Sequence, residues 1–254
     1  MPEDIRHVTQ RQPFVTSDGT LEFMEVLGVP LPPVGSRTLT PPNPNNGASA
    51  QLCDGRFVTV REDSNGGLSG RLLDSDGHEL TPDFVVSPFQ EGGATPSVAS
   101  TSDGGFAVAW HAWRGPTTAI VYARKFDARG KPQFTRVRIS EPRGENSWAY
   151  AVGLPSGQIA ILWHDVGHAA TRVFVRILSA TMKLTGPPIA VVDGRVGRGY
   201  LRVMCDGTLV ALWNTDRGIA YRADAARVLG KLGTPAPQTP FDFAELTKDC
   251  ATSP

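Results

Sequence analysis

The sequence predicts an all-β protein, a small β-propeller of about five four-stranded blades. Three recurring features support this prediction: a polar turn that ends in glycine and precedes an apolar run, an arginine within a second apolar run, and an apolar closing strand. Similarity at a period of about 20 to 50 residues is typical of solenoids and propellers. Convincing helical periodicity is missing from all 254 residues.

The glycine turn and its apolar run occur five times, as SDGTLEFME, CDGRFVTVR, SDGGFAVAW, PSGQIAILW and CDGTLVALW. Their first glycines are Gly19, Gly55, Gly104, Gly157 and Gly207, separated by 36, 49, 53 and 50 residues. Such turns suit tight hairpins that need a positive φ. Six residues after the glycine stand Glu25, Arg61, Trp110, Trp163 and Trp213. We expect the three tryptophans to pack between blades.

The second feature is an arginine in the third strand, at Arg71, Arg124, Arg176 and Arg222. We expect these arginines to brace their own hairpins, for example Arg124 with Asp103 and Arg222 with Asp206. The closing strands are DFVVS, TRVRIS and PIAVV, so each full repeat holds four strands.

Strand composition favours radial packing of the repeats. The first strands consist mainly of small residues, as in ASAQL, PSVAS and YAVGL, which begins at Tyr150, and small side chains suit a crowded axis. The second strands, FAVAW and IAILW, are apolar on both faces, as expected of strands covered on either side. Blades packed around an axis satisfy both features. A parallel β-helix is the alternative, and it would have shorter coils without two-residue hairpin signals.

We expect one domain over residues 1–254, with repeats near 1–47, 48–93, 94–146, 147–197 and 198–254. The first blade is predicted to be truncated or irregular, because residues 26–47 are rich in proline, which cannot donate to a strand ladder. The segment 4–8, DIRHV, is a candidate outer strand for the last blade, and it would close the ring.

The pattern P-x-V-A-x-x-x-D-G-G-F-x-V-x-W, followed by FDARGKPQ, resembles the propeller-type repeats of large secreted bacterial adhesin-like and calcium-associated proteins. The resemblance covers roughly residues 48–224 and is strongest at 95–140. It implies a fold and names no activity. We expect an extracellular or periplasmic location, although the opening MPEDIRHVTQ lacks the basic-then-apolar order of a signal peptide.

Charge and cysteine content narrow the classes of partner. The 25 basic and 25 acidic residues cancel, which argues against a nucleic-acid or anionic-membrane surface. No apolar run reaches the length of a transmembrane helix. Three scattered cysteines do not form a zinc site or a disulfide framework. We expect a bridge between Cys205 and Cys250, with three free thiols, including Cys53, as the alternative.

The predicted site lies in the loops between the second and third strands, which open at one end of a propeller. The predicted ligand-binding residues are Arg61, His111, Trp113, Arg114, His164, Asp165, His168, Asn214, Asp216 and Arg217. Aromatic faces and bidentate donors suit sugars or peptides, and Trp113 is the best candidate for an exposed stacking residue. The alternative interpretation is that these loops are solvated turns.

Catalytic signatures are weak. No cofactor is predicted, and a divalent metal on His164, Asp165 and His168, with His111 beside them, is a secondary hypothesis. The segment LDSDGHEL lacks the alternating ligands of a calcium loop. The inner strands carry no paired carboxylates for glycoside hydrolysis, and G-x-S-x-G is missing.

The sequence therefore predicts a recognition module for carbohydrate, a small molecule or a cell-surface component. A metal-assisted hydrolase or lyase is the alternative. A scaffolding protein that binds another protein is the third reading.

Overall fold

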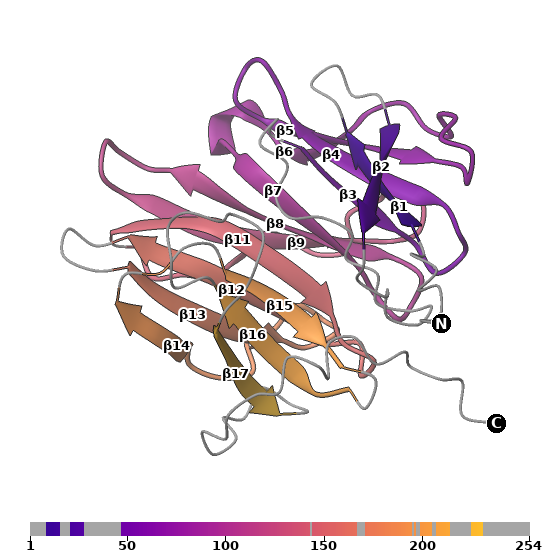
Figure 1. Cartoon of the computed structure of the whole chain (residues 1–254). Helices are drawn as coiled ribbons and strands as arrows, with labels where there is room; N and C mark the ends of the chain where they lie inside the picture. The colour runs from indigo at the N-terminus through magenta and orange to yellow at the C-terminus, as the bar shows by residue number, and fades with distance from the viewer. Residues whose placement is uncertain are drawn as a thin grey trace, which may run out of the picture.

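The computed structural model describes residues 9–15, 21–27, 47–142, 144–166, 171–194, 196, 199–204, 207–213 and 225–230. The predicted all-β class is confirmed (Figure 1). The one helical element among the described residues is a single 3-10 turn, η1 (Phe89–Glu91). None of the described segments forms a helix long and apolar enough to cross a bilayer.

The strands form consecutive antiparallel meanders. The first meander contains β3 (Gly47–Gln51), β4 (Phe57–Glu62), β5 (Leu68–Leu73) and β6 (Phe84–Ser87). The second contains β7 (Ala94–Ser100), β8 (Phe106–Trp113), β9 (Ala119–Phe126) and β10 (Val137–Arg138). The third contains β11 (Glu145–Gly153), β12 (Ile159–Val166), β13 (Thr171–Leu178) and β14 (Ile189–Gly194). The fourth contains β15 (Gly199–Val203), β16 (Leu209–Trp213) and β17 (Ala225–Gly230), and a separate hairpin pairs β1 (Thr9–Val15) with β2 (Leu21–Leu27).

The meanders are arranged through their first strands. β1 lies against β3, β3 against β7, β7 against β11, and β11 against β15. The second and third meanders are also joined into one sheet by a single parallel pair, Ala119 with Glu145. The first strands of successive meanders therefore lie side by side in a row, and the other strands of each meander follow from it (Figure 1).

The predicted glycine hairpins are confirmed where the structure describes them. Gly55, Gly104, Gly157 and Gly207 have φ values of 88°, 83°, 79° and 82°. Each glycine N–H donates to the carbonyl three residues earlier, for example Gly104 to Thr101 at 3.0 Å. A side chain is strained at such φ values, so glycine fixes the turn between the first and second strands.

The core lies between facing meanders. In β8, every residue from Phe106 to Ala112 is buried, and only Trp113 is exposed. Trp110 packs in the cluster between the first and second meanders, and Trp163 packs in the cluster between the second and third. Trp213 is partly buried against the cluster between the third and fourth. The predicted packing role of the three tryptophans is confirmed.

Arginines of the third strands link each meander to the preceding one. Arg124 donates to the Val86 carbonyl at 3.3 Å, and Arg176 donates to the Ile139 carbonyl at 2.8 Å. In the fourth meander, Arg227 donates to the Ala190 carbonyl at 2.7 Å. Charged donors thus satisfy carbonyls at the outer edge of the neighbouring meander.

The predicted pair of Arg124 with Asp103 is wrong. Lys125, which is 3% exposed, holds Asp103 instead, with Nζ 2.7 Å from Oδ2. Successive residues of a strand point to opposite faces, so Arg124 and Lys125 cannot both turn toward the same side. The predicted pair of Arg222 with Asp206 lies outside the described residues, as do Cys205, Cys250 and residues 4–8.

The strand register also shows that a different arginine is the fourth copy of the repeated arginine. Arg124, Arg176 and Arg227 all pair across the hairpin with the residue two positions before the tryptophan, which is Val108, Ile161 and Ala211 respectively. Arg227, and not Arg222, is therefore the equivalent of Arg176.

We expect Arg176→Ala to lower the free energy of unfolding by about 1–2 kcal/mol, because the Ile139 carbonyl loses a charged donor. Urea unfolding followed by circular dichroism measures this change. Arg138→Ala is the control, since Arg138 is an exposed arginine of β10. Equal losses in the two variants would show that the link between meanders contributes nothing.

Candidate functional site

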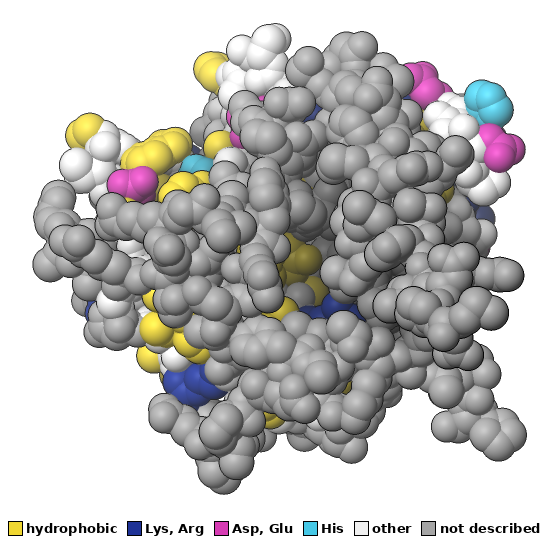
Figure 2. Space-filling model, viewed as in Figure 1, with side chains coloured by type: hydrophobic (Ala, Val, Ile, Leu, Met, Phe, Trp, Pro, Cys, Tyr) yellow, Lys and Arg dark blue, Asp and Glu magenta, His cyan; other side chains and the backbone are white. Residues whose placement is uncertain are grey.

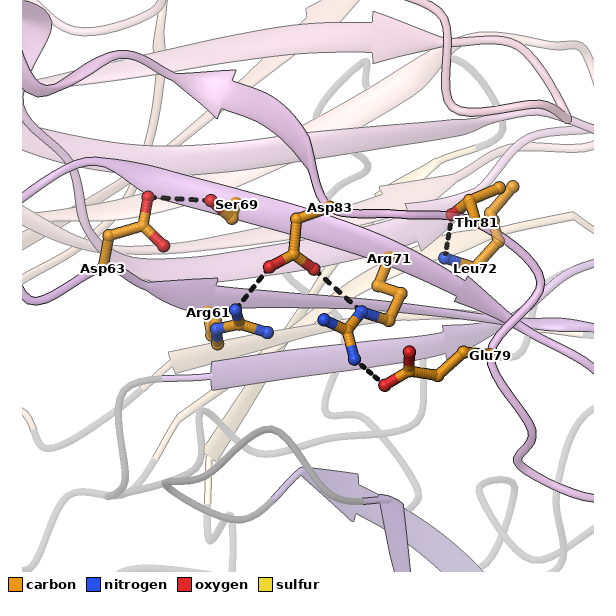
Figure 3. A network of polar contacts seen from close by, with 8 residues as sticks. All are labelled: Arg61, Asp63, Ser69, Arg71, Leu72, Glu79, Thr81 and Asp83. Carbon is orange, nitrogen blue, oxygen red and sulfur yellow. Dashed lines mark hydrogen bonds and ion pairs between the residues drawn. The ribbon is translucent and has the colours of Figure 1, made fainter.

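Arg61 belongs to a polar network on the first meander (Figure 3). The Asp83 carboxylate lies between Arg61 Nη2, at 2.5 Å, and Arg71 Nε, at 2.8 Å, and Arg71 also pairs with Glu79. Burial opposes ionisation of Asp83, but the hydrogen bonds and charges of Arg71 and Arg61 outweigh it and lower its pKa. Arg61 is thus held within its own meander.

Glu62, Thr95 and His111 come together at the junction of the first and second meanders. The Thr95 N–H donates to Glu62 Oε1 at 2.6 Å, and Thr95 Oγ1 lies 2.8 Å from His111 Nδ1. Thr95 has a φ of 44°, which is uncommon for a β-branched residue, and it lies where the register between β7 and β8 shifts. The bulge turns both polar groups of Thr95 toward the neighbouring side chains.

Burial favours the neutral forms of both ionisable groups in this junction. It raises the pKa of Glu62, against the opposing effect of the Thr95 N–H, and it lowers the pKa of His111 to about 4. His111 is 5% exposed and carries no charge at neutral pH.

His164 occupies the same register position in the third meander as His111 in the second, directly after the buried tryptophan. It is fully buried, and its Nε2 accepts the N–H of Gly199 at 3.0 Å. This hydrogen bond joins the third meander to β15 and requires the neutral ring with its proton on Nδ1. His164 is therefore an internal link between two meanders.

Two exposed indoles lie edge-to-face on these buried imidazoles. Trp113 contacts His111, with ring centroids 6.0 Å apart and an interplanar angle of 83°. Trp148 contacts His164 at 5.5 Å and 81°. Trp113 is 47% exposed and Trp148 is 39% exposed. Hydrophobic side chains gather with a histidine and an acidic side chain on the upper left of Figure 2, over the β8–β9 end of the sheet in Figure 1.

The sequence did not identify Trp148, because β11 begins earlier than predicted. The expected first strand starts at Tyr150, whereas β11 starts at Glu145 and contains a register shift between Ser147 and Tyr150. Trp148 lies within this shift with a φ of 49°. Glu145, the first residue of β11, likewise lies outside the strand expected from Tyr150.

A buried amide fastens the second and third meanders beneath this surface. Trp163 Nε1 donates to Asn146 Oδ1 at 3.0 Å, and Asn146 Nδ2 donates to the Ala119 carbonyl at 3.1 Å. Trp163 and Asn146 are 2% and 4% exposed. Buried polar groups that are satisfied in this way hold a unique geometry, so the amide fixes the start of β11 against β9.

Of the remaining predicted residues, Asp165 and Arg114 contact other side chains, and four lie outside the described residues. Asp165 pairs with Arg172, and Arg114 lies over the Tyr122 ring, 5.4 Å from its centroid. Arg136 lies over the same ring, 4.5 Å from its centroid. His168, Asn214, Asp216 and Arg217 lie outside the described residues.

One group of residues in the described segments has the composition of a metal site. Asp74, Asp76 and His78 offer ligand atoms within 4.8 Å of one another in an exposed turn. The Asp74 carboxylate already accepts the N–H groups of Asp76 and His78, both at 2.9 Å. Asp127 accepts two N–H groups in the same way in the next repeat, so this arrangement is a repeated turn motif.

The chain matches no protein-family model and no curated protein. Among the solved structures that it resembles, three are similar to this chain over most of their own length. An endo-arabinase from Bacteroides thetaiotaomicron is 12% identical, with 77% of this chain and 76% of that chain covered and a TM-score of 0.48. An α-L-arabinofuranosidase from Lactobacillus brevis is 10% identical, with coverages of 88% and 84% and a TM-score of 0.47.

An endo-1,4-β-xylanase from Bacteroides thetaiotaomicron is 9% identical, with coverages of 66% and 64% and a TM-score of 0.45. No family follows from these likenesses. With TM-scores below 0.5 they assign neither an activity nor a ligand to this chain.

Proposed function

We propose that the chain is a β-propeller that recognises carbohydrate at the end carrying Trp113 and Trp148. Three observations support the propeller: the antiparallel meanders follow one another, their first strands lie side by side, and equivalent arginines link each meander to the preceding one. Radial blades would account for all three.

The observation that carries the ligand proposal is the pair of exposed indoles that contact buried histidines. Each rests on a neutral, buried imidazole of the same register position, in neighbouring meanders. An indole that is held in place before binding loses little conformational entropy when a ligand stacks on it. Single exposed hydrophobic residues are ordinary, but two indoles supported in the same way are more informative.

The chemistry of this surface fits a sugar better than a metal. Aromatic faces pack against the apolar faces of sugar rings, while nearby polar groups bond the hydroxyls. The metal-assisted hydrolase hypothesis needs His164 as a ligand, and its Nε2 already accepts the Gly199 N–H. Carbohydrate recognition therefore remains the proposal that the described contacts support best.

We expect Trp113→Ala to weaken carbohydrate binding by about 1–3 kcal/mol, because a stacking residue is removed. The thermal unfolding midpoint should change little, since the side chain is about half exposed. A glycan array identifies the ligand, and calorimetry then measures its dissociation constant for the wild type and the variant.

Phe134→Ala is the matched control, because Phe134 is an exposed aromatic residue, 37% accessible, that precedes β10 at the outer edge of the second meander. It should bind like the wild type. A Trp113→Ala variant with wild-type affinity for every glycan bound by the wild type would remove Trp113 from the site. Zinc or another metal that copurifies in stoichiometric amount and is lost in His164→Ala would favour the hydrolase alternative.

A further inference from the structure

Trp113 and Glu145 lie in one row across the junction of the second and third meanders. Trp113 pairs with Ala119 across the β8–β9 hairpin, and Ala119 pairs with Glu145 across the β9–β11 bridge. Residues paired directly across strands project to the same face of a sheet. Two strand spacings separate Trp113 from Glu145, which is about 10 Å between Cα atoms. Ala119, the residue between them in the row, has a small side chain and is fully buried.

Trp148 continues the same surface along β11. Ser147, two residues after Glu145, pairs with His164, and the Trp148 ring lies on the His164 ring. Glu145 and Ser147 share one face of β11, because they are two positions apart. Glu145, which is half-buried, therefore lies in the sheet between Trp113, across the row, and Trp148, three residues along its own strand.

This surface is held rigidly by buried contacts on its inner side. The Ala119 N–H donates to the Gly144 carbonyl at 3.1 Å, and Asn146 donates to the Ala119 carbonyl at 3.1 Å. The two residues that flank Glu145 in the sequence thus fix it against β9. Trp113 and Trp148 are each held by a buried imidazole. The spacing of the three side chains is consequently set before any ligand arrives.

We propose that Trp113, Glu145 and Trp148 form one binding strip for a neutral oligosaccharide that crosses the junction of the two meanders. The proposal rests on the proposed function and extends it from a sugar to a chain of sugars. One sugar residue stacks on each indole, and Glu145 accepts hydrogen bonds from hydroxyl groups of the sugar between them.

The separation of the indoles and the charge of Glu145 decide the ligand class. We expect a chain of sugars, and not a single ring, to reach both indoles, because the row from Trp113 to Glu145 spans about 10 Å between Cα atoms and Trp148 lies three residues further along β11. The carboxylate repels an acidic sugar placed between the indoles. Affinity should accordingly rise with chain length until both indoles are covered, and then level off, because the second stacking contact becomes part of the same binding event.

Calorimetry with a length series tests the strip. The probes are neutral linear oligosaccharides of glucose, mannose, galactose, xylose and arabinose, from the monosaccharide to the hexasaccharide. For the series that binds, we expect Trp113→Ala and Trp148→Ala each to weaken binding of the longest member about tenfold or more. Each variant should also abolish the gain in affinity with length. Glu145→Gln keeps the shape of the side chain and should weaken the long probes several-fold.

Phe134→Ala controls for the loss of an exposed aromatic residue outside the strip, and circular dichroism confirms that each variant is folded. Affinity that does not depend on length, or a loss confined to one of the two tryptophans at every length, would overturn the strip while leaving a carbohydrate site in place. Tighter binding of uronic-acid oligomers than of neutral ones would overturn the role given to Glu145. If the wild type binds no saccharide, the proposed function fails, and the strip fails with it.

Discussion

Replacing Trp163 with alanine is expected to lower the free energy of unfolding by about 3–5 kcal/mol, the cost of a large cavity in a packed core. Trp163 is 2% exposed and stacks on Phe174, with ring centroids 5.5 Å apart. The substitution also removes the donor to Asn146 Oδ1. Urea unfolding followed by far-ultraviolet circular dichroism measures the loss without depending on tryptophan fluorescence.

Trp110 provides a matched comparison that separates packing from hydrogen bonding. It occupies the same register position one meander earlier and is fully buried, and its Nε1 has no hydrogen-bond partner among the described residues. Phenylalanine keeps an aromatic ring at either position but has no donor. We expect Trp163→Phe to cost about 1 kcal/mol more than Trp110→Phe, because only the former leaves the Asn146 carbonyl without its donor. Equal costs would show that the Asn146 link does not stabilise the fold.

The sequence was sufficient to predict features that depend on residues close together in the chain. The glycines that end the turns need a positive φ, and Gly55, Gly104 and Gly157 have it. The apolar runs after them predicted second strands that are covered on both faces, and β8 and β12 are buried along nearly their whole length. These patterns involve residues that are close in the sequence, so they can be recognised without knowing how the meanders face one another.

Contacts between meanders were not predictable from the same signals. Arg124 was expected to pair with Asp103 of its own hairpin, but Arg124, like Arg176, donates to a backbone carbonyl of the preceding meander. Every residue has a backbone carbonyl, so the sequence does not show which carbonyl accepts the hydrogen bond. The pairing of Thr95 with Glu62 likewise depends on a bulge that shifts the register of β7.

Only part of the candidate site was predicted, because the sequence patterns identify residues that follow the repeat and miss those that depend on strand register. His111, Trp113 and His164 follow the repeat, and the structure brings each histidine against an indole. Trp148 lies in a bulge, outside the pattern of alternating residues, and only the register of β11 brings it to His164. The histidines themselves were expected at the surface, whereas both are buried and support the exposed rings.

The buried state of His111 leads to a pH dependence with a defined sign. Its pKa is 6.5 in an ordinary environment and about 4 in the folded chain, because burial disfavours the charged ring. Between these values the unfolded chain binds a proton that the folded chain does not. The stability is therefore fully present above pH 6.5, is lost as the pH falls toward 4, and loses nothing further from this group below pH 4. The expected loss is about 3 kcal/mol.

His111→Gln isolates this contribution from those of other groups. Glutamine cannot be protonated in this range, and its amide can still bond the Thr95 hydroxyl. The raised pKa of Glu62 acts in the opposite direction, because the folded chain takes up that proton first, and the lowered pKa of Asp83 destabilises only near or below 3.8. Glu62 and Asp83 are both present in His111→Gln, so their effects cancel when the variant is compared with the wild type. The difference in unfolding free energy between wild type and His111→Gln should thus shift by about 3 kcal/mol in favour of the variant between pH 7 and pH 4. Parallel curves across that range would mean that the imidazole accepts a proton as readily in the folded chain as in water, and would contradict its burial beneath Trp113.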